Sequence, residues 1–207
     1  MKKCCTFAKK YFFTFSKNNM ILPVYVYGWP LLRKKSEDIT PDYPNLQQLI
    51  ADMFETMYKA EGCGLAAPQI GLNIRLIVID GEQMADKDNP NDMLRTFKKI
   101  LINPRITERF GDEWSDEEGC LSLPKIRETV KRPSKIKIDY LDENFEPHSE
   151  EYDGMAARII QHEYDHIEGS MFIDRISPLR RKLIFAKLNA IAKGKIECKY
   201  KIKVFKK

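Results

Sequence analysis

No stretch of the sequence is long and apolar enough to cross a membrane as a helix. A spanning helix needs roughly 18 consecutive apolar residues, and no run of that length occurs among the 207 residues, of which 31% are charged. The basic start lacks the apolar centre of a signal peptide because Lys9, Lys10 and Lys17 interrupt it. The sequence therefore favours a cytoplasmic protein with no membrane partner.

Cysteine is too scarce and too irregularly spaced for a disulfide framework. The five cysteines lie at positions 4, 5, 63, 120 and 198, an odd number with no C-x-x-C pair. We expect reduced thiols, free or bound to a metal. The net charge of +5 is too small to indicate a nucleic-acid partner by itself.

The chain also lacks internal repeats and linker-like stretches, so we expect one folded domain over residues 20–194. Residues 1–19 are rich in Lys and Phe without periodicity and are interpreted as a disordered extension or a segment before the true start at Met20. Residues 195–207 are interpreted as a basic C-terminal tail.

Helical and extended patterns alternate irregularly along this domain. Apolar residues at three-and-four spacing predict helices over about 45–60, over 153–168 and from Ser177 onward, and β-branched or alternating runs predict strands at 74–80, 99–103 and 136–140. The last helix is expected to turn five apolar residues inward: Leu179, Leu183, Ile184, Leu188 and Ile191. This order predicts an α+β fold, with mixed, mainly antiparallel strands around a central helix.

Histidine is the rarest chemically useful residue, with three in the chain, and two of these share the segment QHEYDH. His162 and His166 lie four residues apart, so they project from one face of the predicted helix and can reach one cation, with Glu163 beside them. The alternative is two solvated helix histidines with an incidental glutamate. His148 lies in a polar segment and is interpreted as a surface residue.

Two histidines do not complete a metal site, and no histidine follows His166. The segment EGCLSLP at 118–124 offers Cys120 as a third ligand, although a lone cysteine is most often a buried structural residue. The carboxylate of Glu118 and the hydroxyl of Ser122 are unusual neighbours for an inert thiol. A third segment, GCGLAAPQIG at 62–71, permits close backbone approach and carries Gln69 as its one useful polar side chain.

Taken together and in this order, the three segments resemble the motifs of the peptide deformylase family, G-x-G-L-A-A-x-Q, E-G-C-L-S-x-P and H-E-x-D-H. The likeness extends from about Met20 to about Lys193. It implies one divalent metal, with Fe²⁺ favoured and Zn²⁺ or Ni²⁺ as alternatives, held by Cys120, His162 and His166. It implies further that hydroxide on this metal attacks the formyl carbon of an N-terminal formyl-methionine, with Glu163 as general base and then general acid. The Gln69 amide and the Leu121 N–H would stabilise the oxyanion.

The resemblance also suggests how the substrate and partners bind. Gly64 and Ile70 would pair with the peptide backbone, Arg127 would lie near the substrate, and Cys63, Met155 and Ile159 would line the methionine pocket, with Arg158 near its rim. The partners implied are formyl-Met nascent peptides, and the protein is expected to be a monomer. The basic residues in and just after the last helix favour either a transient contact with the ribosome or a solvated basic face: Arg180, Arg181, Lys182, Lys187, Lys193 and Lys195. The rival hypotheses are a metallopeptidase, which the missing downstream ligand disfavours, and a binding protein that has lost catalysis, which would have replaced Gln69, Cys120 or Glu163.

Overall fold

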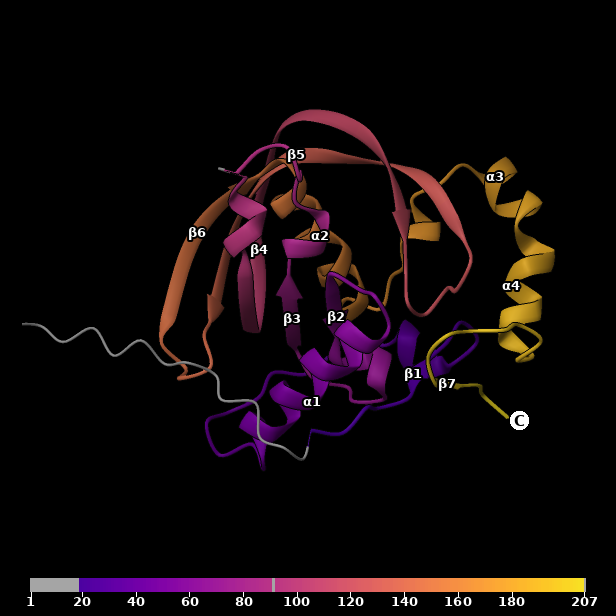
Figure 1. Cartoon of the computed structure of the whole chain (residues 1–207), viewed down its shortest axis with the longest axis horizontal. Helices are drawn as coiled ribbons and strands as arrows, with labels where there is room; N and C mark the ends of the chain where they lie inside the picture. Colours follow the sequence, from indigo (N-terminus) through magenta and orange to yellow (C-terminus); the bar gives the residue numbers. More distant parts are fainter. Residues whose placement is uncertain (1–18, 91, 207) are drawn as a thin grey trace, which may run out of the picture.

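A computed structural model describes residues 19–90 and 92–206, so most of the expected extension over 1–19 lies outside the described residues. The described chain contains seven strands and four α-helices (Figure 1). Within this part of the chain, no helix combines the length and the apolar character needed to cross a membrane.

Five strands form one antiparallel sheet in the order β2-β3-β4-β5-β6. They are β2 (Gly64–Ala66), β3 (Leu76–Asp80), β4 (Lys98–Gly119), β5 (Arg127–Leu141) and β6 (Pro147–Asp153). The strand expected at 99–103 is the start of the much longer β4, which arches with β5 over the top of the molecule in Figure 1. The mixed α+β fold with mainly antiparallel strands is confirmed.

The two long α-helices cover opposite faces of β3, because its side chains alternate between the faces. Leu76 and Val78 pack with α1 (Leu46–Lys59), whose buried residues include Ile50 and Met53. Ile77 and Ile79 pack instead with α2 (Gly154–Ile167). Helix α2 is therefore packed against the face of the sheet that lies opposite α1.

The chain ends in two short helices and a strand. The helices are α3 (Pro178–Leu183) and α4 (Phe185–Ala192), and the strand β7 (Ile202–Lys203) pairs in parallel with β1 (Val24–Tyr25). The predicted inward face of the last helix was wrong in part: Leu188 and Ile191 are buried, but Leu179 and Leu183 are 68% and 65% exposed. The break at Ile184 between α3 and α4 shifts the helical phase, which a pattern assuming one continuous helix misses.

Candidate metal centre and active site

Helix α2 carries both histidines into the interior of the protein. From Ala156 to Ile167 every residue is buried, with His162 9% and His166 1% exposed. Helix α2 can end close to the backbone of Arg33 because Gly169, at φ +74°, has no side chain. A Cβ there would lie 2.8 Å from the Arg33 carbonyl. The predicted helix over 153–168 matches the observed bounds within one residue.

Cys120 reaches the same point from the turn that joins β4 to β5. The turn is fixed by the Leu123 N–H, which donates to the Cys120 carbonyl at 2.9 Å. The Cys120 Sγ lies 3.1 Å from the His166 Nε2. Ligand atoms of Cys120, His162 and His166 all lie within 4.8 Å of one another, so the structure brings the three predicted metal ligands together.

The electrostatics of this cluster favour a thiolate. Burial alone would raise the pKa of the Cys120 thiol, but the neighbouring imidazoles of His166 and His162 lower it to about 5. Burial would likewise lower the pKa of His162, yet Cys120 and Glu118 raise it well above its ordinary value. A thiolate with two imidazoles is a donor set that suits zinc, iron or nickel.

Glu118 orients His162 from behind. Its Oε2 accepts from the His162 Nδ1 at 2.9 Å, which leaves the Nε2 facing the cluster. The same carboxylate accepts from Arg132 at 2.6 and 2.9 Å and from Arg158 at 2.6 Å. Although burial acts to raise the pKa of Glu118, Arg132 and His162 hold that pKa well below its usual range, so the carboxylate stays charged.

The charge network continues along α2 to Asp165. Arg132, which is fully buried, donates to Asp165 at 2.9 Å, and Arg175 donates to the same carboxylate at 2.7 and 2.5 Å. Arg132 thus joins the acid that orients His162 to the acid that precedes His166. The sequence assigned no role to Arg132, Asp165 or Arg175, because Arg132 of β5 and Arg175 reach Asp165 only once α2 packs against the sheet and the chain after it folds back.

Gln69 points its amide nitrogen at the cluster. Its Oε1 accepts the Ala66 N–H at 2.8 Å, and its Nε2 lies 3.5 Å from the Cys120 Sγ and 3.4 Å from the Ser122 hydroxyl. Since the Oε1 is held by a backbone donor, the side-chain N–H groups face the cluster. The Leu121 N–H donates to no acceptor among the described residues, so it is free to bind a ligand oxygen.

Glu163 is enclosed beside the ligands. It is 4% exposed, and its Oε2 has no hydrogen-bond partner among the described residues. Burial is the main cause that raises its pKa above the ordinary value. The carboxylate packs on Gly64, where an added Cβ would lie 2.6 Å from the Glu163 Oε1. A glycine is therefore required at this position for the acid to reach the site.

A cavity of about 850 Å³ opens beside this cluster. Its lining includes Cys120, Leu121, His162, Glu163 and Gln69, together with five of the predicted substrate-binding residues, Cys63, Gly64, Arg127, Met155 and Ile159. Ile70 is not among the described residues that line it, because its side chain packs in the core beside α1. Arg158 lines the cavity and is tied down by the carbonyls of Val130 and Trp114 as well as by Glu118.

Comparison with known proteins identifies the family that shares this arrangement. The model of the polypeptide deformylase family matches residues 21–182, which is most of the chain. The chain belongs to the polypeptide deformylase family. It is 51% identical over 188 residues to the peptide deformylase of Christiangramia forsetii, covering 89% of this chain and 96% of that protein. It is 50% identical over 192 residues to that of Flavobacterium psychrophilum, covering 91% and 99%.

Solved structures agree with this assignment. A crystal structure of a peptide deformylase from Legionella pneumophila superimposes with a TM-score of 0.72 at 38% identity, covering 85% of this chain and 98% of that one. Deformylases are metalloenzymes of protein biosynthesis, and the Cys–His–His cluster is a group able to hold the metal. The chain is thus a hydrolase that removes the formyl group from the N-terminus of nascent polypeptides.

Proposed function

We propose that Cys120, His162 and His166 hold one divalent cation and that the cavity beside them is where a formyl-methionine end reacts. The observation that carries this proposal is the convergence of three ligand atoms within 4.8 Å of one another, beside a carboxylate whose Oε2 has no partner among the described residues. Three protein ligands leave a coordination position open, as catalytic rather than structural sites do. When bound, the cation would lower the pKa of a water from ~15.7 toward ~7 and polarise the formyl oxygen.

The residues around the cluster would stabilise the oxyanion and transfer the proton. The Gln69 Nε2 and the Leu121 N–H donate to the oxygen that gains charge as the formyl carbon is attacked. Removing one such donor typically costs about 2.7–4 kcal/mol in the barrier. Glu163 takes a proton from the attacking water at its Oε2 and delivers it to the leaving nitrogen, which completes formate and the free amine. Its raised pKa and enclosed position suit a group that both accepts and releases a proton.

The substrate would lie along the edge of β2 that pairs with no strand among the described residues. Since β2 is the first strand of the sheet, its edge beyond Gly64 can accept an extended peptide by backbone pairing. Cys63, Met155 and Ile159 form an apolar part of the cavity that fits a methionine side chain. Arg127, whose side chain pairs with Glu117 at 2.5 Å, stands at the exposed side of the same cavity.

The nature of the metal is tested together with the activity. We propose Fe²⁺ as the resident ion, with Zn²⁺ or Ni²⁺ as alternatives, because the donor set suits all three. Metal analysis of anaerobically purified protein, with a formyl-Met-peptide assay on the same sample, should give about one metal per chain and release of formate. Cleavage of unformylated peptides with no release of formate would favour a metallopeptidase and reject the proposal.

We propose further that the protein acts as a cytoplasmic monomer that contacts the ribosome through α3 and α4. This face carries basic side chains beside the exposed Leu179, Leu183 and Phe185; the basic residues are Arg180, Arg181, Lys182 and Lys187. Basic side chains that bind RNA phosphates release counterions, so binding should weaken steeply as salt rises. Co-sedimentation with ribosomes at low and moderate salt should lose the wild-type signal in a variant with Arg181, Lys182 and Lys187 changed to Glu. Equal sedimentation of both proteins would reject the contact.

A further inference from the structure

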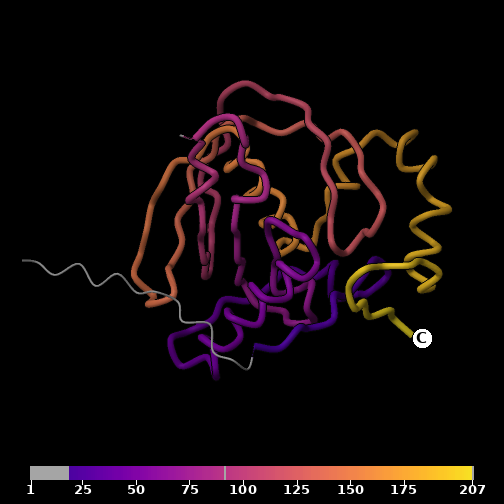
Figure 2. Tube along the Cα trace, in the orientation of Figure 1, coloured from indigo at the N-terminus to yellow at the C-terminus, as the bar shows by residue number. Residues whose placement is uncertain are grey.

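The chain beyond α4 turns back across the molecule and is fixed at both ends. Gly194, at φ +67°, makes the turn, and the Lys195 N–H donates to the Ala190 carbonyl at 2.8 Å. At the far end β7 pairs with β1, and the Trp29 indole donates to the Lys203 carbonyl at 2.8 Å. Figure 2 shows this yellow segment returning from α4 to the indigo start of the domain.

Residues 197–200, here named the strap, lie between these two anchors and line the cavity of the metal cluster. The Tyr200 hydroxyl donates to the Leu121 carbonyl at 2.8 Å, which ties the strap to the turn that carries Cys120. Burial raises the pKa of Tyr200, so its hydroxyl remains a donor. The strap is therefore held directly against the residues proposed to carry out the reaction.

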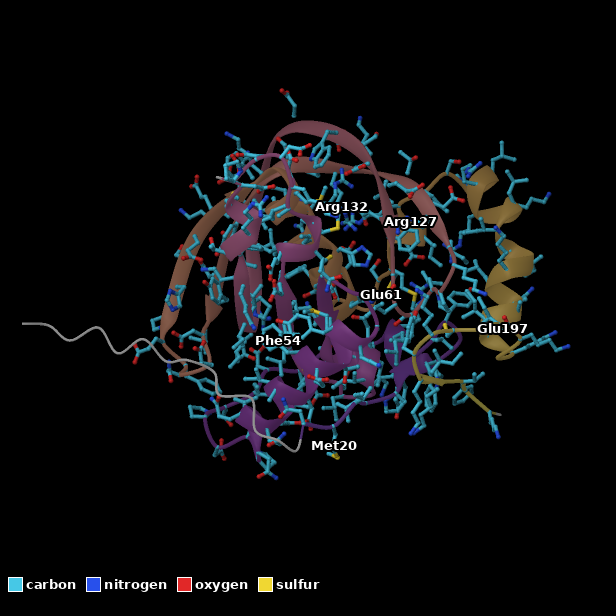
Figure 3. The ribbon with its side chains drawn as sticks, in the orientation of Figure 1. Met20, Phe54, Glu61, Arg127, Arg132 and Glu197 are labelled. Atoms are coloured by element: carbon cyan, nitrogen blue, oxygen red, sulfur yellow. The ribbon has the colours of Figure 1, made fainter. Side chains whose placement is uncertain are left out.

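The strap also forms an ion pair with a second segment that lines the cavity. The Lys199 Nζ lies 3.2 Å from the Glu61 Oε1, in the turn between α1 and β2. Both side chains are well exposed, at 81% and 70%, so the pair contributes little stability, but it marks the opening of the cavity. Figure 3 shows Glu61, Glu197 and Arg127, from three separate segments, on the same side of the molecule.

The exposed fractions of the lining residues show which end of the cavity is closed and which end is open. His162 and Glu163 line the cavity at 9% and 4% exposed and form its closed end, whereas Lys199 and Glu61 stand in solvent at its opening. A peptide whose first residue reacts at the closed end has to leave past Lys199 and Glu61. The match to the family model ends at residue 182, so the strap lies beyond the part of the chain that this model describes.

We propose that the strap is a wall of the substrate site that contacts the residues after the formyl-methionine and selects among them by charge, chiefly through Lys199. The inference rests on the proposed function of the cavity. In the wild type, Lys199 places its ammonium at the opening, 3.2 Å from the Glu61 carboxylate. Replacing Lys199 with Glu leaves three carboxylates there, those of residues 61, 197 and 199, and these should attract a basic substrate residue and repel an acidic one.

The test compares two substrates on the same enzyme sample, formyl-Met-Ala-Lys and formyl-Met-Ala-Glu. The ratio of their kcat/KM values is independent of metal content and of the active fraction. Lys199→Glu should raise this ratio in favour of the lysine peptide by at least about fivefold, the effect of one pair of unit charges at roughly 4 Å in water, because the reversal changes the charge by two units and acts with opposite sign on the two peptides. The shift should shrink as salt is added, and Glu61→Lys in the same chain should bring the ratio back toward the wild-type value.

Lys201→Glu is the matched control. It makes the same charge change two residues further on, at an exposed position outside the cavity lining, and should leave the ratio unchanged. Equal ratios in wild type, Lys199→Glu and Lys201→Glu would overturn the strap proposal while the activity stands. A wild type that releases no formate from either peptide would instead overturn the proposed function.

Discussion

Cys120 and Cys63 line the same cavity, but their surroundings give the two thiols opposite acidities. The imidazoles of His166 and His162 lower the pKa of Cys120 to about 5 against the effect of burial. Burial, followed by the negative charge of Glu163, raises the pKa of Cys63 to about 12. Of these two thiols, Cys120 is thus the one that favours the thiolate at neutral pH, and thiolates are the form that binds metal.

Cys120→Ala should therefore lose both the metal and the activity, whereas Cys63→Ala and Cys198→Ala should retain most of both. Metal content per chain and turnover of a formyl-Met peptide, measured on purified protein, check this expectation. The ligand assignment is wrong should Cys120→Ala still hold about one metal per chain and deformylate normally.

Glu163 should separate metal binding from proton transfer. Glu163→Gln keeps the shape of the side chain but cannot accept a proton, so it should retain the metal and lose at least ~100-fold in turnover. Metal analysis and steady-state kinetics on one preparation distinguish the roles. A variant that turns over at the wild-type rate would exclude the proton role, and one that cannot hold metal would make Glu163 a ligand.

At the residue scale, the sequence predicted those parts of the site whose residues lie close together along the chain. The spacing of His162 and His166 on one helix is enough to predict that they share a cation, and the structure brings Cys120 to them. Arg132 could not be assigned to Glu118 because the two residues meet only once β4 and β5 pair, which places Arg132 opposite Trp114, four residues before Glu118. The strands that the sequence predicts, at 99–103 and 136–140, stop short of both residues.

Among the elements, β6 carries Glu150, which forms a cluster with two tyrosine hydroxyls. The contribution of this cluster to the stability of the fold should depend on pH. Glu150 accepts from the Tyr140 hydroxyl at 2.6 Å, from the Lys99 ammonium at 3.1 Å and from the Tyr152 hydroxyl. Burial acts to raise the pKa of Glu150, but these hydrogen bonds lower it to about 2. Since the folded pKa is below the unfolded value of ~4.3, the contribution to stability is present above about pH 5 and disappears as the pH falls toward 2.

The melting temperature of Glu150→Gln should accordingly lie below that of the wild type at pH 6, and the gap should narrow between pH 5 and pH 2. Glu151→Gln, the next residue on the same strand and an exposed one, is the control and should show no such trend. A gap that stays constant over this range would mean that Glu150 is not held in its charged form by the cluster.

Helices α3 and α4 show where periodicity misleads. Leu179 and Leu188 belong to the same apolar pattern, but Leu179 is 68% exposed and Leu188 1% exposed. Leu188→Ala should lower the free energy of unfolding by about 2–5 kcal/mol. Leu179→Ala should change it by no more than about 0.5 kcal/mol. Chemical denaturation of both variants measures the difference, and equal losses would restore the inward face that the sequence predicted.

At the scale of the whole molecule, the first described residues of the domain are hydrogen-bonded to α1. The Met20 N–H donates to Asp52 at 2.8 Å and the Leu22 N–H to Thr56 at 2.9 Å. We propose that residues 1–19 are dispensable, so a chain starting at Met20 should keep its melting temperature and its activity. A drop of several degrees in a thermal melt would show that the removed residues support the domain.

The parallel pairing of β1 with β7 has a consequence for the order of assembly. Val24 is among the first residues of the domain to be made, and its partner Ile202 is among the last. Contacts between such distant positions close late, because a long loop must lose its freedom first. The wall that residues 197–200 add to the cavity can form only after this closure. A growing chain would then bring Cys120, His162 and His166 together before this wall of the cavity is in place, because the wall has to wait for β7.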